Sequence, residues 1–342
     1  MIDQQRKKRL VWQLPFLALL IVGTIFIIRQ QRATPFQHCA GPIFGTTYSI
    51  TYQHDEDLQA EIVARMKEVD TTLSMFNEES VISQINNNKS ITPTAMFLDV
   101  FQQAQQISKD TDGAFDITVA PLVNLWGFGF KHNETPDQQA VDSLMRFVGY
   151  QKVKYDGHYI VKRDPRIMLD CSAIAKGYGA DVVARLLDEK GVKNYLVEIG
   201  GEVVTRGISE KRLPWKIGVI KPTDDPLQQG NELQTVLNIT DKAMATSGNY
   251  RNFYYKGGKK YAHTIDPKTG QPVQHNILSA TVLTNRCARA DAYATAFMVM
   301  GLEKAQKVLE RNPDLLAYLI YDDNGHNKVW YSPSLKDKIR ER

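Results

Sequence analysis

Residues 194–206, Asn-Tyr-Leu-Val-Glu-Ile-Gly-Gly-Glu-Val-Val-Thr-Arg, contain two apolar strand candidates separated only by two glycines. Links of hairpin length join antiparallel strands, whereas parallel strands need a longer crossover. Just upstream, residues 172–190 have helical patterning that ends at Gly191, a residue type common just beyond a helix C-terminus. This part of the chain therefore predicts a helix followed by an antiparallel strand pair.

The alternation of helices and strands extends over most of the chain. Further helices are expected at 58–73, 97–107, 137–148 and 287–310. Strands are expected at 46–52, 151–155, 158–162, 167–170, 194–199, 202–206, 215–220, 233–239, 251–256, 277–284, 315–321 and 328–331. Short links between many strands favour an α+β fold with mixed, mostly antiparallel sheets and packed helices over a doubly wound parallel sheet. No repeat or linker divides residues 43–342, so we expect one folded body.

Composition and charge exclude several classes of protein. The chain has 342 residues, of which 43% are hydrophobic and 23% charged, as in ordinary globular proteins. Its net charge of +4 comes from residues 1–32, which hold six Lys or Arg and one acid. The remainder has 36 basic and 37 acidic groups, a net charge of −1, and so lacks the basic surplus of a nucleic-acid-binding protein.

The amino-terminal segment predicts a membrane anchor. Leu10–Ile28 is a charge-free run of 19 residues, close to the length needed to cross a bilayer as a helix. Four basic residues precede it and two follow, which favours a cytoplasmic amino end and export of the body. No convincing small-residue cleavage site follows, and Cys39 lacks the small neighbours expected of a lipid-modified cysteine. We therefore expect residues 1–32 to be a basic tip with an uncleaved single-pass anchor, and residues 33–42 to be a tether.

Cysteine usage and the absence of common catalytic motifs exclude several kinds of site. No P-loop, G-x-G-x-x-G, G-x-S-x-G or H-E-x-x-H motif occurs. Three cysteines without a Cys-x-x-Cys pair exclude a zinc ribbon and a thioredoxin-like motif. Cys171 and Cys287 both flank candidate site segments, from which we form the hypothesis that they lie near one another.

Two stretches combine small residues with a charged group next to a predicted turn or helix start. Residues 113–118, Gly-Ala-Phe-Asp-Ile-Thr, place Asp116 beside Phe115 after a turn, where an Asx turn or helix cap is the structural alternative. Residues 170–179, Asp-Cys-Ser-Ala-Ile-Ala-Lys-Gly-Tyr-Gly, begin a helix, and helix N-termini attract phosphate. Lys176 adds a cation suited to a phosphate or a flavin carbonyl, unless it is simply a solvated lysine.

Two further stretches carry candidate acid–base and metal-binding groups. His263 and Asp266 precede a Pro-Lys-Thr-Gly turn, and a His near a carboxylate can act as a general base or be a hydrogen-bonded structural residue. Asp291 and Thr295 lie four residues apart on one face of an otherwise apolar helix. Two oxygen ligands without nearby nitrogen or sulfur suit Mg²⁺ rather than zinc, although a hydrogen bond between the two side chains would also explain them.

The order of these motifs resembles that of the FAD:protein FMN transferases, the ApbE family, from about Phe44 to Val299. The resemblance is carried by Phe44-Gly45-Thr46, Leu73-Ser74-Met75-Phe76, 113–118, 170–178, Glu198-Ile199-Gly200-Gly201, 245–250, 263–270 and 291–295. It implies an ApbE-like fold in which residues 43–342 are the catalytic body. It also implies a membrane-tethered enzyme, here with the body in the periplasm on an inner-membrane anchor, that splits FAD and transfers FMN to a Thr or Ser of a partner protein, releasing AMP.

The resemblance also assigns roles to individual residues. Mg²⁺ would be held by the side chains of Asp291 and Thr295 and by the backbone carbonyl of Ala173. FAD would contact Phe44, Phe76, Ala114, Phe115, Asp116, Asp170, Lys176 and Ile265. His263 would accept the proton of the acceptor hydroxyl, and Asp266 is expected to orient its imidazole. The acceptors implied are subunits of membrane electron-transfer complexes and exported flavin reductases.

Two other functions are compatible with the same residues. With water as acceptor, the protein would be a Mg²⁺-dependent FAD pyrophosphatase that yields free FMN and AMP. Without turnover, it would be an exported flavin-binding carrier, although a carrier needs neither a metal nor a base.

Overall fold

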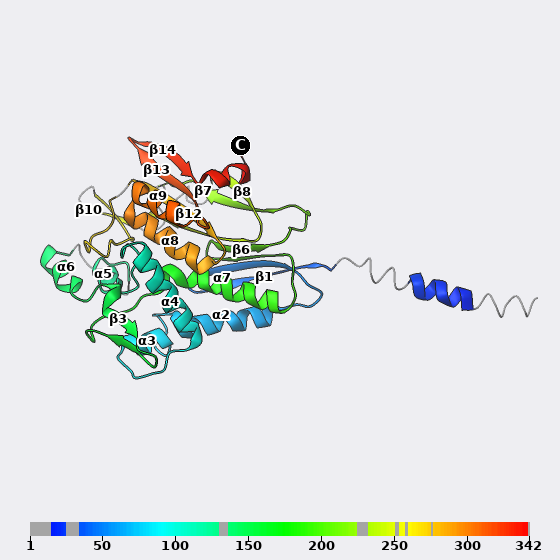
Figure 1. The fold of residues 1–342 in the computed structure, drawn as a ribbon, viewed down its shortest axis with the longest axis horizontal. Coiled ribbons are helices and arrows are strands. Elements are labelled where there is room, and N and C mark those ends of the chain that lie inside the picture. The colour runs from blue at the N-terminus through cyan, green and yellow to red at the C-terminus, as the bar shows by residue number, and fades with distance from the viewer. Residues whose placement is uncertain are drawn as a thin grey trace, which may run out of the picture.

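The computed structural model describes residues 15–24, 34–129, 136–223, 232–249, 253–256, 259–274 and 276–340. A short helix over residues 15–24 lies apart from the folded body (Figure 1). The helices of the body are α2 (Gln59–Leu73), α3 (Val81–Asn86), α4 (Ala95–Asp110), α5 (Ala120–Leu125), α6 (Gln138–Met145), α7 (Ser172–Glu189), α8 (Cys287–Met300) and α9 (Leu302–Arg311), with 3₁₀ turns η1 (Tyr150–Lys152) and η2 (Pro333–Lys338). The fold is α+β.

In the described part of the chain, the strands form one large sheet and three small ones. They are β1 (Phe36–Ile43), β2 (Thr46–Gln53), β3 (Val153–Tyr155), β4 (Ile160–Lys162), β5 (Tyr195–Ile199), β6 (Glu202–Arg206), β7 (Trp215–Ile220), β8 (Leu233–Ile239), β9 (Lys242–Gly248), β10 (Phe253–Lys256), β11 (Lys259–Ala262), β12 (Ile277–Thr284), β13 (Leu316–Asp323), β14 (His326–Tyr331) and β15 (Ile339–Arg340). The large sheet has the order β1-β2-β5-β6-β9-β12-β13-β14, and each of these strand pairs is antiparallel. The mostly antiparallel α+β prediction is confirmed.

Helices α7 and α8 lie at the centre of the body, packed against each other and against the large sheet (Figure 1). Helix α8 contacts β9 and β12, α7 contacts β5 and β6, and α2 and α4 pack on their other side. Helix α8 is apolar on nearly all faces, the pattern of a helix buried on every side. Asp291 is a charged residue within this apolar helix, so hydrophobic packing does not explain why it is buried.

The segment expected to be a tether is partly a strand, and the body begins earlier than predicted. Phe36–Ile43 forms β1, which pairs with β2 along its whole length, from Phe36 opposite Gln53 to Ile43 opposite Thr46. Pro42 does not prevent this pairing, because β1 is an edge strand of the sheet and a proline is tolerated where one side of a strand has no hydrogen-bonded neighbour.

Several other elements differ from the sequence prediction. Residues 167–170 are not a strand, because the Asn86 side chain pairs with both backbone groups of Leu169 in place of a neighbouring strand. The helix expected at 287–310 is two helices, divided at Gly301, whose φ is 78°. The sequence analysis also did not anticipate α3, α5, β9, β11, β15 and the 3₁₀ turn η2.

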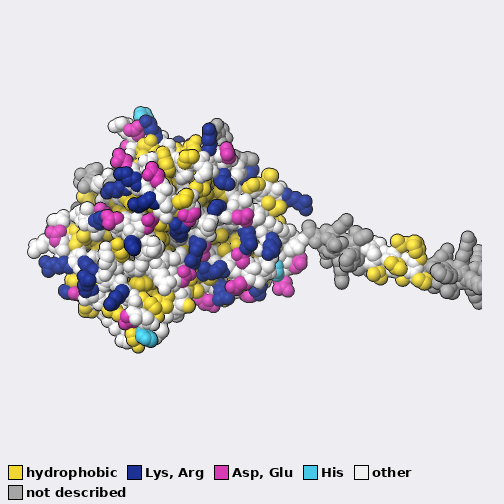
Figure 2. Space-filling model, in the orientation of Figure 1, with side chains coloured by type: hydrophobic (Ala, Val, Ile, Leu, Met, Phe, Trp, Pro, Cys, Tyr) yellow, Lys and Arg dark blue, Asp and Glu magenta, His cyan; other side chains and the backbone are white. Residues whose placement is uncertain are grey.

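The proposed membrane anchor falls mainly on residues outside the described part of the chain. Within Leu10–Ile28, residues 15–24 are described; they are helical, and their large apolar side chains such as Phe16 and Leu19 are exposed. No helix among the described residues combines the length and the hydropathy needed to cross a bilayer. In the view of Figure 2, basic and acidic side chains alternate over the visible face of the body, and apolar side chains cover the short helix.

The three cysteines are free and buried. Cys171 packs in the hydrophobic cluster that includes α4, and Cys287 packs in the cluster that includes α2 and β5. The Cys287 thiol donates to the carbonyls of Val203 and Met244, each at 3.5 Å. No disulfide links Cys171 to Cys287.

Candidate active site

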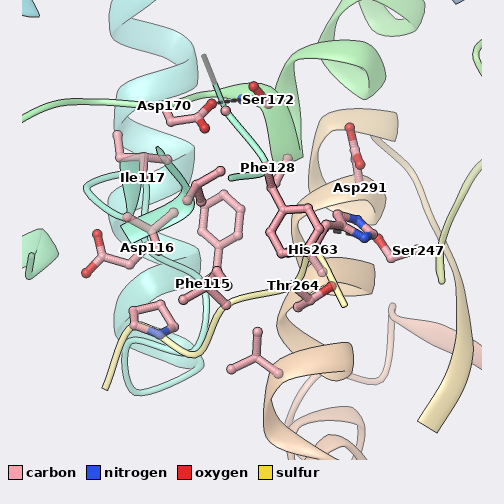
Figure 3. Close-up of a pocket in the computed structure, with 18 of the residues that line it drawn as sticks. Phe115, Asp116, Ile117, Phe128, Asp170, Ser172, Ser247, His263, Thr264 and Asp291 are labelled. Carbon is pink, nitrogen blue, oxygen red and sulfur yellow. Dashed lines mark hydrogen bonds between the residues drawn. The ribbon is translucent and has the colours of Figure 1, made fainter. Parts of the chain in front are cut away.

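A cavity of about 350 Å³ opens between α7, α8, the turn at 113–118 and the segment 263–267 (Figure 3). Its wall combines apolar side chains with a few convergent polar groups, the usual character of a ligand site. Eleven of the residues singled out from the sequence line it: Phe76, Ala114, Phe115, Asp116, Asp170, Ala173, Lys176, His263, Ile265, Asp291 and Thr295. Residues more than 200 positions apart in the sequence therefore share one surface.

Two predicted site residues do not line this cavity. Phe44 lines a second cavity of about 520 Å³, which shares Phe76 and Lys176 with the first. Asp266 lies in the turn that follows His263, where its Oδ1 accepts from the Lys268 N–H at 2.9 Å. The hydrogen bond of Asp266 to Lys268 stabilises the turn, and its expected role in orienting the His263 imidazole stays a prediction.

Asp291 lies in the first turns of α8 and is almost fully buried, with 4% exposure. Its Oδ2 accepts from the backbone N–H of Gly177 at 3.0 Å, across the α7–α8 contact. Burial raises the pKa of Asp291, while Lys176 and the Gly177 amide oppose that rise. In a regular helix the Gly177 N–H would donate to the carbonyl oxygen of Ala173. The hydrogen bond to Asp291 competes with that pairing. It therefore favours an Ala173 carbonyl oxygen that is available to a cation.

Thr295 follows Asp291 by one helical turn and points to the same region. Its Oγ1 lies 3.2 Å from Ser247 Oγ, which comes from β9. The hydroxyl pair extends the set of oxygen atoms at the cavity wall. The sequence-based alternative, a direct hydrogen bond between Asp291 and Thr295, does not appear among the hydrogen bonds of the described residues.

Lys176 forms an ion pair inside the site. Its Nζ lies 2.5 Å from Oε1 of Glu202, a side chain of β6 with 2% exposure. Burial raises the pKa of Glu202 to about 8, helped by the charge of Asp291 and opposed by Lys176. Burial by itself would lower the pKa of Lys176, but Asp291 and Glu202 raise it above its ordinary value. Lys176 is therefore a cation paired with Glu202 in the site, not a solvated lysine.

The oxygen atoms near Asp291 fit a hard divalent cation. Across the described residues, no cluster of three or more His, Cys, Asp or Glu side chains is suited to hold a metal. Zinc and iron sites are normally built from such clusters. Mg²⁺, by contrast, is usually bound through one or two carboxylates, with waters and substrate phosphates completing its coordination. One buried carboxylate with neighbouring hydroxyl and carbonyl oxygens matches this second pattern.

His263 follows β11 and lies between Phe128 and Ser247 in the view of Figure 3. The His263 and Phe128 rings meet edge to face, with centroids 6.4 Å apart. The next residue, Thr264, is fixed by its hydroxyl, which donates to Asn249 Oδ1 at 2.7 Å. On its other side, Ala262 is paired with Phe253 of β10, so a half-buried imidazole faces the cavity from a segment fixed at both neighbours.

The carboxylates of Asp116 and Asp170 serve local structure. Asp116 accepts from the N–H and hydroxyl of Thr118 and from the N–H of Tyr150, at 2.7–2.8 Å. Asp170 accepts from the Ser172 N–H at 2.7 Å, at the start of α7. Burial nevertheless raises the pKa of each of these two groups. The turn interpretation of Asp116 is therefore confirmed, and this residue also lines the cavity.

Sequence reasoning missed other residues of the cavity wall, among them Glu202, Ser247 and Phe128. Glu202 follows the Gly200-Gly201 pair directly, and Ser247 lies within the quoted stretch 245–250, so both were adjacent to recognised motifs. Nothing in the local pattern around Phe128 marks it as a site residue.

Comparison with known proteins identifies close relatives. The model of the ApbE family matches residues 44–320. A Vibrio cholerae protein named FAD:protein FMN transferase is 37% identical over 310 residues, covering 87% of this chain and 91% of its own length. The Escherichia coli K12 protein of the same name is 34% identical over 340 residues, covering 93% and 95%. The solved structure of the flavin transferase ApbE from Vibrio cholerae superposes with a TM-score of 0.80 at 35% identity, covering 89% of this chain and 99% of that one.

Proposed function

The chain belongs to the ApbE family, and on that premise we propose that it is a Mg²⁺-dependent enzyme that cleaves FAD, attaches FMN covalently to a Thr or Ser of a partner protein and releases AMP. The name shared by the curated relatives supports flavin transfer to a protein. The observation that carries the rest is the convergence of His263, Lys176, Asp291 and Thr295 on one cavity. A flavin carrier needs no such combination of a base, a cation and a metal-binding carboxylate.

The reaction requires an oxygen nucleophile, a proton acceptor and a stabilised leaving group. The acceptor hydroxyl oxygen attacks the phosphorus on the FMN side of the FAD diphosphate, and its proton passes to a ring nitrogen of His263. The bond from that phosphorus to the oxygen bridging to AMP breaks, and AMP leaves with the bonding electrons. The edge-to-face contact with Phe128 holds the His263 ring toward the cavity during this step.

Residues of α7 and α8 provide positive charge for the diphosphate. Asp291, Thr295 and the carbonyl of Ala173 would hold Mg²⁺, which neutralises diphosphate charge when bound. Lys176, fixed by Glu202, adds a second positive charge at the cavity wall. Phe76, a side chain with 74% exposure at the edge shared by the two cavities, offers an aromatic face to one of the ring systems of FAD.

We also propose that the body is held at the periplasmic face of an inner membrane by the segment Leu10–Ile28. The charge-free run with basic residues ahead of it supports this proposal. The exposed apolar side chains of residues 15–24 support it as well, since an exposed apolar helix is stable in lipid rather than in water. Subunits of membrane electron-transfer complexes and exported flavin reductases are the proposed acceptors.

Measuring the transfer of FMN to an acceptor protein tests this proposal. Full-length protein in detergent is incubated with FAD, Mg²⁺ and a candidate acceptor, and the acceptor is weighed by intact-protein mass spectrometry. The proposal expects a mass gain of one FMN on a Thr or Ser and one AMP per modified acceptor. Free FMN and AMP with every acceptor unmodified would indicate a pyrophosphatase, and FAD binding without AMP release would indicate a carrier; either result would reject the proposal.

A further inference from the structure

Glu202 is a buried charged residue of the site to which the proposed mechanism assigns no contact with substrate or metal. It begins β6, directly after the Gly200-Gly201 turn, and its side chain has 2% exposure. Oε1 lies 2.5 Å from Lys176 Nζ. Oε2 is buried and has no hydrogen-bond partner among the described residues.

An unpartnered carboxylate oxygen in the interior is costly, because it has lost its hydration without gaining a donor. Four buried side-chain oxygens in the described part of the chain share this condition. Three are neutral hydroxyls, those of Ser108, Ser279 and Thr284. The fourth, Glu202 Oε2, belongs to a residue that lines the cavity, where a ligand can supply the missing donor.

The backbone around Glu202 is built to keep the pair with Lys176 in place. Gly200 has φ of 62°, and a Cβ there would lie 3.2 Å from Cδ of Lys176, so the glycine leaves room for the lysine stem. On the strand side, Ile199 is paired with Glu202 across the β5–β6 turn. The backbone of Glu202 is therefore fixed by strand pairing, and its side chain is confined by burial and by the pair with Lys176.

The charges of the site are unbalanced without a further cation. When ionised, Asp291 and Glu202 carry two negative charges, and Lys176 carries one positive charge. Mutual repulsion of the two carboxylates contributes to the raised pKa of Glu202. A divalent cation at Asp291 would reverse the sign of the cluster and suit it to a diphosphate.

We propose that Glu202 is a positioning residue for the Mg²⁺ site, with Oε1 holding Lys176 and Oε2 accepting a hydrogen bond from a water molecule bound to the cation. The inference rests on the proposed function in that it takes Mg²⁺ to be held at Asp291. Mg²⁺ retains several of its waters in protein sites, and these waters are donors. Some carboxylates lie outside the coordination shell and hydrogen-bond to the metal ligands. Mutation of such a carboxylate typically weakens metal binding by 10- to 100-fold.

The experiment measures binding of Mg²⁺ alone to the full-length protein in detergent, by isothermal titration and by the Mg²⁺-induced rise in Tm. In Glu202→Gln the amide can keep its oxygen on Lys176, but its NH₂ cannot accept from a water. We expect this variant to bind Mg²⁺ about 10- to 100-fold more weakly than the wild type. Glu202→Asp keeps the charge and both acceptors, and is expected to recover part of that loss.

The matched control is Glu198→Gln, which removes the same charge from the same hairpin at an exposed position of β5. It should bind Mg²⁺ as the wild type does. Tm without Mg²⁺ establishes that Glu202→Gln is folded, and we expect it to be no lower than in the wild type because a neutral amide is less costly to bury.

Two results would overturn the proposal. Wild-type Mg²⁺ affinity in Glu202→Gln would show that Oε2 takes no part in the site. Complete loss of binding, as expected for Asp291→Asn, would make Glu202 a direct ligand instead. In either case the acceptor-transfer assay on the wild type still tests the proposed function separately.

Discussion

The backbone N–H of Gly177 donates to Oδ2 of Asp291 over 3.0 Å, where α7 and α8 come into closest contact. A Cβ at Gly177 would lie 2.4 Å from the Cys287 carbonyl oxygen, a distance that real side chains do not adopt. The absence of a side chain at Gly177 thus permits both the helix contact and the hydrogen bond that orients the proposed metal carboxylate.

Gly177→Ala is expected to separate the two helices and displace Asp291. Overpacking of this kind typically costs about 1–3 kcal/mol in the free energy of unfolding. The variant should therefore be less stable in denaturant titrations and should bind Mg²⁺ more weakly by isothermal titration. If stability fell while Mg²⁺ affinity stayed at the wild-type value, the bond from Gly177 would have no part in orienting Asp291.

Asp291 and Thr295 are expected to differ in their importance. Asp291→Ala removes the charge that a divalent ion needs, so it should abolish FMN transfer and lower FAD affinity. Thr295→Ala removes a neutral ligand that water can replace, so partial activity should remain. Initial rates over a Mg²⁺ series measure both effects, and undiminished activity of Asp291→Ala at limiting Mg²⁺ would exclude Asp291 from the site.

His263→Ala is expected to retain binding of FAD and Mg²⁺ but to lose most FMN transfer, because proton removal contributes to the transition state and little to the ground state. The rate should fall by a factor on the order of 10² to 10⁴. Single-turnover transfer at saturating FAD isolates this step. Transfer at the wild-type rate would mean that another group accepts the proton.

Substitutions at Asp266 distinguish its two possible roles. In the structure its Oδ1 accepts the Lys268 N–H. Asn supports such a turn as well as Asp does, so Asp266→Asn should transfer FMN at close to the wild-type rate, whereas Asp266→Ala should be impaired. If Asp266 instead orients the His263 ring by its charge, Asp266→Asn will be slowed as much as Asp266→Ala.

The stability of the protein should depend on pH through Asp181, on α7. This carboxylate accepts the N–H groups of Cys287 and Ala288 at the start of α8, and burial raises its pKa from 3.8 to about 6. The folded state therefore binds the Asp181 proton more tightly than the unfolded state does. This proton stabilises the fold by on the order of 3 kcal/mol below about pH 4, and the stabilisation is lost as the pH rises through about 6.

Asp181→Asn removes that titration. As the pH is raised from 4 to 7, the unfolding free energy of the wild type should therefore fall relative to that of the variant. Urea titrations of both proteins at several pH values measure it. A difference that does not change with pH would contradict the assignment.

Local patterns in the sequence were sufficient for most of the secondary structure. Helix α7 and its end at Gly191, the β5–β6 pair and the antiparallel class of the sheet all follow from periodicity and link length. The motif order, and the family resemblance it carries, also named eleven residues of the cavity wall. Each of these elements and motifs is encoded within a few neighbouring residues, so the sequence alone determines them.

Other features depend on partners distant in the chain. Whether Phe36–Ile43 is tether or strand is decided by pairing with β2, and residues 167–170 form no strand because Asn86, from α3, binds their backbone. The Lys176–Glu202 pair joins α7 to β6, and the Gly177–Asp291 bond joins α7 to α8. Only the tertiary structure could decide these, because burial and charge at each of them are set by packing between elements and not by the residues next to them in sequence.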